Sequence, residues 1–266
     1  MLEGLHDDDR SRDLIKSLEK GIAVLRIFSE SRGPLTMARI AEQAGLSRPA
    51  VRRILLTLEH LGYAYQHGGQ WGLTPRVLEI GAGYFSKSSL PEIAAPYLQI
   101  VVDRIGETCH VGVWDRHEVV HVARVEVPRV VPDSIHIGTR LPAYATAIGL
   151  VLLAGLNELE LAEYFASTDR VRLTPETVVD EAPLRARIDA VRDAGFAITQ
   201  GELALGTSGV AVPLTVQGQV VGALGVTSNP LRNSANDLVT KIVPILLEVG
   251  ADISRSYELA RRRRLN

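Results

Sequence analysis

The feature that most constrains this chain lies between residues 36 and 61, where two helical patterns are separated by one glycine. In the first pattern, apolar residues recur at helical spacing and Thr36 is placed to cap the start. Gly45 then supplies the left-handed backbone that ends a helix and permits a sharp turn. Ser47 is predicted to cap the second helix. The apolar face of this second helix is predicted to be buried, and it consists of Val51, Ile54, Leu55, Leu58 and Leu61.

The flanking segments extend this pattern to a recognisable supersecondary motif. A helix is predicted from near Ser17, and a two-stranded hairpin is predicted after the second helix, with its turn at His67–Gln70. Helix, short helix, glycine turn, arginine-bearing helix and hairpin follow one another within about 60 residues. This order predicts a winged helix-turn-helix domain over residues 14–74.

The second helix carries the candidate DNA-reading side chains. Arg48 and Arg52 are four residues apart and share one face near the helix start, where arginine can bind guanine or phosphate. Arg53 lies about 100° further round the helix and could instead hold the domain together. The further candidates for DNA contact are Thr36, Ser47, Thr57, His67 and Gln70.

An amphipathic core helix with a solvated basic face is the alternative interpretation of this segment. The distribution of charge favours DNA binding. Residues 31–76 hold six arginines against two acidic residues, whereas the whole chain has a net charge of −2. Positive charge is thus concentrated where a polyanion would bind.

Composition excludes several classes of protein. No apolar run is long enough to span a membrane, and the acidic residues 1–13 do not resemble a secretory signal. The single cysteine, Cys109, excludes an intramolecular disulfide. We therefore expect a cytoplasmic protein without a membrane partner.

The rest of the chain alternates between helical and β-rich patterns. Residues 75–89 are predicted to form a linker helix, and residues 90–260 a second domain whose strand-rich middle is flanked by helices. The predicted fold class is therefore α+β, with the winged domain joined by the linker to a larger domain.

Several motifs, in this order, resemble the IclR family of transcriptional regulators over nearly the whole chain, from about residue 14 to 258. They are SLEKGIAVLRIF, LTMARIAEQAGLSRPAVRRILLTLEHLGY, LTPRVLEIG, GTRLPAYATAIG, RDAGFAITQGELALGTSGVAVPL and VVGALGVTS. The second and fourth look most like the PcaR/PobR branch, which responds to aromatic acids and β-ketoadipate-pathway metabolites. The resemblance implies a GAF-like α/β effector-binding domain and a homodimer or homotetramer. A symmetric pair of DNA-binding domains in turn predicts a pseudo-palindromic DNA site, and we expect no cofactor.

The resemblance also implies an effector site. Its residues are Ile148, Gly149, Thr199, Thr207, Gly209, Gly225 and Thr227. Regulators of very small oxo-acids have a cysteine in place of Gly209 and a serine in place of Gly225. We expect the two glycines to enlarge the site and to favour a bulkier ligand such as a benzoate-like acid. The expected effector is a small aromatic or dicarboxylic acid.

Other side chains are candidates for binding the carboxylate or ring of the effector. The charge partners are His121, Arg124, His136 and Arg140, although a salt bridge that holds the fold is an equally good interpretation of Arg140. Helix-start N–H groups near Gly149 would also suit a carboxylate. Tyr144 could cover an aromatic ring, but a core position is the better prediction.

Histidines near Cys109 suggest a metal or catalytic-cysteine site, because Cys109, His117 and His121 could share one face of two strands. The spacing matches no compact metal-ligand motif, and no nucleophile-elbow or P-loop context is present. The main hypothesis is thus a ligand-responsive DNA-binding regulator rather than an enzyme. The alternative is a ligand-binding or enzymatic α+β domain whose N-terminal helices serve only dimerisation.

Overall fold

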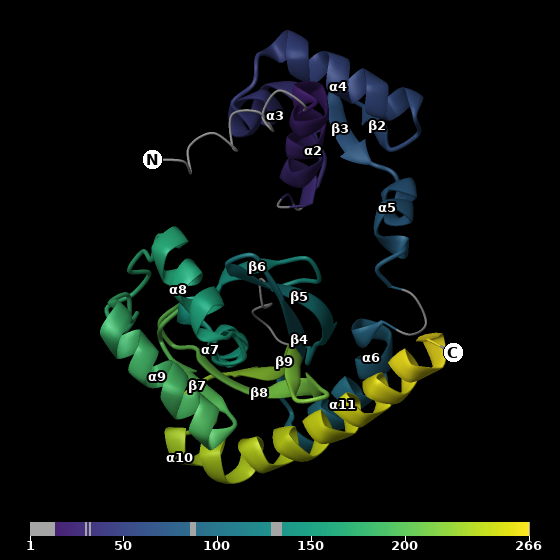
Figure 1. Ribbon diagram of the computed structural model, residues 1–266. Coiled ribbons are helices and arrows are strands. Elements are labelled where there is room, and N and C mark those ends of the chain that lie inside the picture. Colours follow the sequence, from purple (N-terminus) through teal and green to yellow (C-terminus); the bar gives the residue numbers. More distant parts are fainter. Residues whose placement is uncertain (1–13, 30, 32, 86–88, 129–134, 266) are drawn as a thin grey trace. The chain divides into compact units, whose positions relative to one another are not determined.

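The computed structural model describes residues 14–29, 31, 33–85, 89–128 and 135–265 (Figure 1). The chain divides between Tyr84 and Phe85 into two compact units, at a point inside the segment predicted as a linker. The exact boundaries at 74 and 89 stay predictions, and residues 86–88 lie outside the described part. Within the described residues, no helix is both long and apolar enough to cross a membrane.

The N-terminal unit is a helical domain with a small antiparallel sheet. Its elements are α2 (Lys16–Ser29), β1 (Leu35–Thr36), α3 (Met37–Ala44), α4 (Arg48–His60), β2 (Ala64–His67) and β3 (Gln70–Leu73). The strand order is β1-β3-β2, so the predicted hairpin gains a third strand in which Leu35 pairs with Trp71. The largest core side chains of this unit are Ile27, Phe28, Leu35, Ile40, Leu55 and Trp71.

The segment predicted as a linker helix is less regular than expected. It begins with the 3-10 turn η1 (Pro75–Val77) and continues as the five-residue helix α5 (Leu78–Ala82). Gly81 and Gly83 explain why the helix ends here, since glycine is the weakest helix former after proline. The prediction of one continuous helix over residues 75–89 was therefore wrong for the part that the structure describes.

The C-terminal unit is built around one antiparallel sheet. Its strands are β4 (Thr108–Asp115), β5 (Glu118–Val125), β6 (Arg140–Pro142), β7 (Ala197–Gln200), β8 (Ser208–Val216) and β9 (Gln219–Ser228). They are ordered β6-β5-β4-β9-β8-β7, so the two long hairpins β4–β5 and β8–β9 meet in the centre through β4 and β9 (Figure 1).

Helices cover both faces of this sheet. They are α6 (Leu90–Ile105), η2 (Ala143–Ala145), α7 (Ala147–Ala154), α8 (Glu158–Ser167), α9 (Glu181–Ala194), α10 (Ala235–Asp237), the π-helical turn η3 (Leu238–Ile242) and α11 (Val243–Leu265). Helices α6 and α11 pack on one face, and α7 packs on the other. The C-terminal helix continues to Leu265, past the predicted domain end at 260.

The side-chain size along the central strands differs between the two faces. Val210 and Val226 point toward α6 and α11, where they join a core of large aliphatic side chains. On the other face, Ala211 and Ala223 pack against α7. Small residues on that face let the helix approach the sheet closely, and this close approach positions the site described next. The predicted fold class, a winged helix-turn-helix followed by an α/β domain, is confirmed.

Candidate functional site

The turn between α3 and α4 has the predicted geometry. Gly45 is left-handed at φ 62°, and the Thr36 hydroxyl accepts a hydrogen bond from the Arg39 amide at 3.4 Å. Ser47 has the extended backbone of an N-cap residue, but its side chain makes no capping hydrogen bond. Ser47 is exposed beside the start of α4.

Helix α4 presents its arginines on two different sides. Arg48, Arg52 and Arg53 are all exposed, and within the described part of the chain no carboxylate pairs with them. Arg53 and Thr57, however, line a groove between α2 and α4, and the Thr57 hydroxyl donates to the Arg53 carbonyl at 2.8 Å. Arg48 and Arg52 do not border this groove. The structure therefore separates the two strongest DNA candidates from the other two residues.

The same groove accounts for a partial failure of the predicted core stripe. Val51 and Leu55 are fully buried, but Leu61 is 48% exposed. The groove has an apolar floor that includes Leu18, Ile22, Leu25, Ile54, Leu58 and Leu61. One side of α4 thus packs on the domain core, and a second apolar side is open.

The wing is a tight hairpin whose tip is exposed. His67 and Gln70 pair with each other across the turn, and Gly68 and Gly69 both have positive φ, as a two-residue hairpin turn requires. The side chains of His67 and Gln70 are exposed at this tip, where a wing would meet a DNA backbone.

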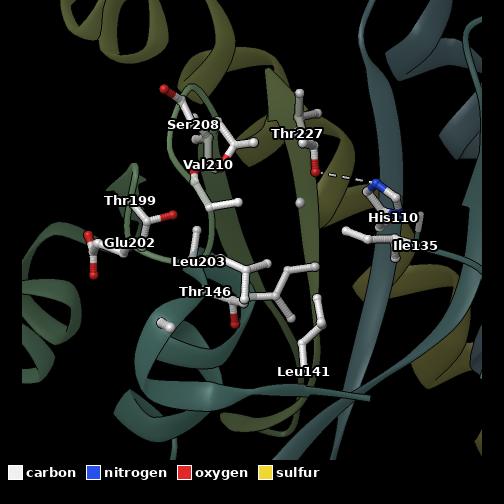
Figure 2. A pocket seen from close by; sticks show the side chains of 18 of the residues that line it. His110, Ile135, Leu141, Thr146, Thr199, Glu202, Leu203, Ser208, Val210 and Thr227 are labelled. Carbon is white, nitrogen blue, oxygen red and sulfur yellow. Dashed lines mark hydrogen bonds between the residues drawn. The ribbon is translucent and has the colours of Figure 1, made fainter. Parts of the chain in front are cut away.

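The C-terminal unit contains a cavity of about 300 Å³ between the small-residue face of the sheet and the start of α7 (Figure 2). This volume is at the lower end of the range typical of small-molecule sites. Seven of the predicted effector residues line it, namely His121, Ile148, Thr199, Thr207, Gly209, Gly225 and Thr227. The other five do not, namely Arg124, His136, Arg140, Tyr144 and Gly149.

The start of α7 is fixed by a cap and by a glycine. The Thr146 hydroxyl accepts a hydrogen bond from the Gly149 amide at 3.1 Å. A Cβ at Gly149 would lie 2.1 Å from the Ala143 carbonyl oxygen, so only glycine allows the helix to start against this turn. Gly149 therefore shapes the site without contacting the cavity.

Gly209 and Gly225 do not enlarge the site as the sequence suggested. A Cβ at Gly225 would lie 2.6 Å from Ile148 Cγ1, and one at Gly209 would lie 2.8 Å from the Thr199 hydroxyl. Neighbouring side chains already occupy the space that the glycines leave. The expectation of extra room for a bulkier effector was wrong at both positions, because Ile148 of α7 and Thr199 of β7 fill the gap.

Two of the expected charge partners are already paired with acidic residues. The Arg140 guanidinium binds Glu118 at 2.6 Å and Asp115 at 2.7 Å at the β4–β5 turn, which supports its interpretation as a residue that holds the fold. The Arg124 guanidinium binds Glu126 at 3.0 Å and lies 3.5 Å from Nδ1 of the exposed His136.

Tyr144 is a core residue, as the better of the two predictions had it. Its side chain is 3% exposed, and its hydroxyl donates to the Val171 carbonyl at 2.9 Å. The same hydroxyl oxygen accepts a hydrogen bond from the Val171 amide at 3.0 Å, so both of its roles are used within the fold.

His110 lines the cavity although it was not among the predicted effector residues. Its ring lies 5.1 Å from the His121 ring in an edge-to-face arrangement, and its Nε2 is 3.4 Å from the Thr227 hydroxyl (Figure 2). Burial, His121 and Arg124 together hold the pKa of His110 well below its usual range. The imidazole is therefore neutral near pH 7, with one donor and one acceptor nitrogen.

Other lining residues gave no separate signal in the sequence. Leu141, Thr146 and Leu203 line the cavity from the segments next to predicted site residues. The motifs that contain these residues were identified from the sequence. The sequence alone does not show which residues of a motif point into the cavity.

One rim of the cavity is a loop, residues 201–207, that is anchored at its first end. Glu202 is buried, and both of its oxygens bind Arg187, at 2.6 and 2.9 Å. Thr177 also donates to the Glu202 carbonyl at 2.7 Å. The Gly201 amide also donates to the Thr207 carbonyl at 2.7 Å and closes the base of the loop, whereas Leu205, near the tip, is 67% exposed.

The cysteine and histidines do not form the shared face that the sequence suggested. Cys109 points toward α6 and α11, whereas His110 and His121 line the cavity on the opposite face of the sheet. A β-bulge between Val111 and Gly112 shifts the register of β4 and β5. Because of this shift, His121 does not lie on the face of the sheet that simple alternation predicts for it. Among the described residues, no three His, Cys, Asp or Glu side chains are grouped as metal ligands.

A winged helix-turn-helix and a separate domain with a small-molecule cavity define the class of ligand-responsive DNA-binding regulators. Two family descriptions match the chain, the IclR helix-turn-helix domain over residues 17–68 and the bacterial transcriptional regulator IclR C-terminal domain over residues 82–255. The chain belongs to the IclR family of bacterial transcriptional regulators.

Individual relatives confirm the resemblance to the PcaR/PobR branch. The p-hydroxybenzoate hydroxylase transcriptional activator of Acinetobacter baylyi is 37% identical over 253 residues, which cover 93% of each chain. The Pca regulon regulatory protein of Pseudomonas putida is 35% identical over 243 residues, covering 91% of this chain and 84% of the relative. Both relatives are regulators, so the hypothesis of an enzyme is set aside.

A solved structure extends the likeness to three dimensions. An IclR homologue from Microbacterium hydrocarbonoxydans, crystallised in complex with 4-hydroxybenzoate, aligns with a TM-score of 0.81 and 25% identity. The alignment covers 92% of this chain and all of the homologue, 100%.

Proposed function

We propose that this regulator binds its operator through Arg48 and Arg52 and that a small aromatic acid in the cavity controls this binding. The observation that carries the proposal is the pairing of an exposed arginine face on α4 with a cavity of about 300 Å³ in the other domain. Relatives named for p-hydroxybenzoate and for the Pca regulon support an aromatic or dicarboxylic acid as effector. A cytoplasmic location follows from this role.

In the proposed DNA complex, α4 lies in the major groove with its N-terminal end toward the bases. Arg48 and Arg52 sit on that end and are exposed. Thr36, Ser47, His67 and Gln70 are also exposed, at the start of α3, the start of α4 and the wing tip, where phosphate contacts are expected.

The test is binding to the protein's own promoter region and to random DNA at several salt concentrations. Replacing Arg48 and Arg52 by alanine should lose about 1–3 kcal/mol of discrimination per base contact. Arg53→Ala is the control for each single variant, Arg48→Ala or Arg52→Ala, because it also removes one positive charge from α4 but on the side of the α2–α4 groove. Sequence preference retained by the double variant, or lost equally in the control, would refute the assignment.

We also propose that the α2–α4 groove is covered by a second copy of this chain. Leu18, Ile22 and Leu61 are 60%, 48% and 48% exposed, and such a contiguous apolar surface is unfavourable in water. A pair of identical reading heads would match a pseudo-palindromic site. Ile22→Asp should therefore lower the oligomeric state in sedimentation experiments, and an unchanged mass would refute this interface.

We propose that the effector regulates DNA binding by shifting the dimer or tetramer between two arrangements of its winged domains. An acid that binds one arrangement more tightly shifts the equilibrium toward that arrangement. The free energy of this shift cannot exceed the difference between the acid's binding free energies for the two arrangements. A thermal-shift screen of benzoates, β-keto acids and short oxo-acids tests the effector class. If none of them raises the melting temperature, the proposed effector class is wrong.

A further inference from the structure

The end of helix α11 carries a concentration of positive charge. Residues 252–265 hold five arginines against two acidic residues, a net charge of +3, and four of the arginines are consecutive at 261–264. Residues 90–251 hold 12 basic against 19 acidic residues, a net charge of −7. One end of an otherwise acidic domain is thus basic, as expected where only that end meets a polyanion.

The arginines at this end are only partly compensated within the domain. Glu258 is the last acidic residue of the sequence, and it binds Arg262 at 2.7 Å. Arg261 and Arg263 are exposed, and no carboxylate among the described residues pairs with either of them. Arg261 instead lies over the Tyr257 ring, 5.9 Å from its centre. Two exposed guanidinium groups are therefore available to an anion outside the chain.

The stability of α11 does not by itself account for this run of arginines. The helix dipole favours cations at a helix C-terminus, but the effect falls off within the last turn. Like charges close together on a helix repel one another. Successive residues of a helix also point about 100° apart, so Arg261 and Arg263 present their charge on different sides of the helix. This arrangement suits an extended polyanion better than a single carboxylate.

The basic end of α11 lies where the chain enters the effector-binding domain. Helices α6 and α11 are antiparallel, since the Tyr97 hydroxyl is 2.7 Å from the Ser256 hydroxyl and Arg104 binds Glu248 at 3.0 Å. The start of α6 therefore lies beside the end of α11 (Figure 1).

The connection from the winged domain to this end is short. From Ala82 at the end of α5 to Leu90 at the start of α6, the chain spans at most about 29 Å even when fully extended. When the winged domain binds DNA, the connection therefore limits how far the basic end of α11 can lie from the same duplex.

We infer that Arg261 and Arg263 bind phosphates of the DNA that flanks the site read by α4, and so form a second DNA-contact surface. A guanidinium group binds phosphate through paired hydrogen bonds, whereas contacts to phosphate carry no sequence information directly. The surface therefore adds affinity and salt dependence but no discrimination between sequences. This inference rests on the proposed function, since it assumes that the winged domain binds DNA.

The experiment measures binding of the full chain to its own promoter region and to random DNA between about 50 and 200 mM salt. Each phosphate contact contributes about 0.9 to the slope of log K against log salt concentration, so Arg261→Gln with Arg263→Gln should make the slope shallower by about 1.8 per protomer. Over this range the variant should lose roughly tenfold less affinity per protomer than the wild type. Its preference for the promoter region should stay unchanged, unlike that of the α4 variants.

Two control variants separate this contact from net charge and from folding. Arg104→Gln with Lys241→Gln also removes two positive charges, but at the opposite end of α6 and α11, from exposed ion pairs that contribute little to stability. Arg261→Lys with Arg263→Lys keeps both charges in place. Both controls should retain the wild-type slope, and circular dichroism establishes that each variant is folded.

The outcomes distinguish this inference from the proposed function. A wild-type slope in the glutamine variant overturns the inference but leaves the winged domain as the DNA-binding surface. An equal change of slope in the Arg104 and Lys241 control also overturns it, because net charge rather than position then decides. If the glutamine variant keeps the slope but sediments as a smaller assembly, the arginines bind the acidic surface of a second copy instead. If the wild type binds neither DNA, the proposed function fails and the inference fails with it.

Discussion

Replacing Gly225 by alanine should destabilise the effector-binding domain even though the position borders a cavity. The new Cβ would lie 2.6 Å from Ile148 Cγ1, 2.9 Å from its Cδ1 and 3.2 Å from the Val210 carbonyl oxygen. Carbon atoms in contact prefer about 3.5–4.0 Å, so Ile148 must move by about 1 Å. The backbone of Gly225 is not left-handed, so the cost arises from packing.

Overpacking of this size costs about 1–3 kcal/mol in a buried core. A domain of this length loses about 2–4 °C of melting temperature per kcal/mol, so we expect a fall of about 6 °C. Ile148 is itself 6% exposed and at the start of α7, and its movement should also weaken effector binding.

The assay is calorimetric unfolding of the wild type, Gly225→Ala, Ile148→Ala and the double variant. Ile148→Ala alone leaves a void and costs about 2–5 kcal/mol. In the double variant the alanine Cβ fills part of that void, so the combined loss should be smaller than the sum by about 1–2 kcal/mol. A wild-type melting temperature for Gly225→Ala, or strictly additive losses, would refute the packing argument.

Three further predictions concern single side chains. Because the pKa of His110 is held well below 6.5, the unfolded chain binds more protons below pH 6.5. Stability from this group is therefore complete above pH 6.5 and falls by up to about 1.4 kcal/mol per pH unit below it. Urea unfolding at pH 7.5 and 5.5 should show this loss, and it should shrink in His110→Leu but not in the exposed-residue variant His67→Ala. Arg187→Met leaves Glu202 buried without its cation and should cost about 3 kcal/mol in urea unfolding, with faster effector release; a neutral result would show that the 201–207 loop is anchored elsewhere. Arg140→Ala removes a partner of two acidic residues outside the cavity, so effector affinity should stay within about twofold; a larger loss in titration would return Arg140 to the site.

The fold was predicted best where a local pattern requires one particular backbone conformation or hydrogen bond. Gly45 is left-handed as expected, and Thr36 caps α3 as expected. The hairpin turn at Gly68–Gly69 is another such case. By contrast, β1 has only two residues, too few for any periodicity to show before its partner β3 is known.

The site was predictable as a set of motifs but not as a set of contacts. Glycine at 209 and 225 reads in a sequence as an absent side chain, and only the fold shows that Thr199 and Ile148 fill the gap. His110 and Cys109 are neighbours in sequence, yet their side chains lie on opposite faces of the sheet. A β-bulge decides which histidine joins which face, and a bulge leaves no clear sequence signal.

The burial of Cys109 makes this residue an intrinsic probe of the opening of the effector-binding domain. It is the single thiol of the chain, it is fully buried under α6 and α11, and burial raises its pKa. A thiol reagent can therefore modify the native protein only when the effector-binding domain opens, while unfolding of the winged domain leaves no covalent trace. A bound effector should slow this modification in proportion to its occupancy, so labelling rates followed by mass spectrometry would measure affinity without any engineered probe.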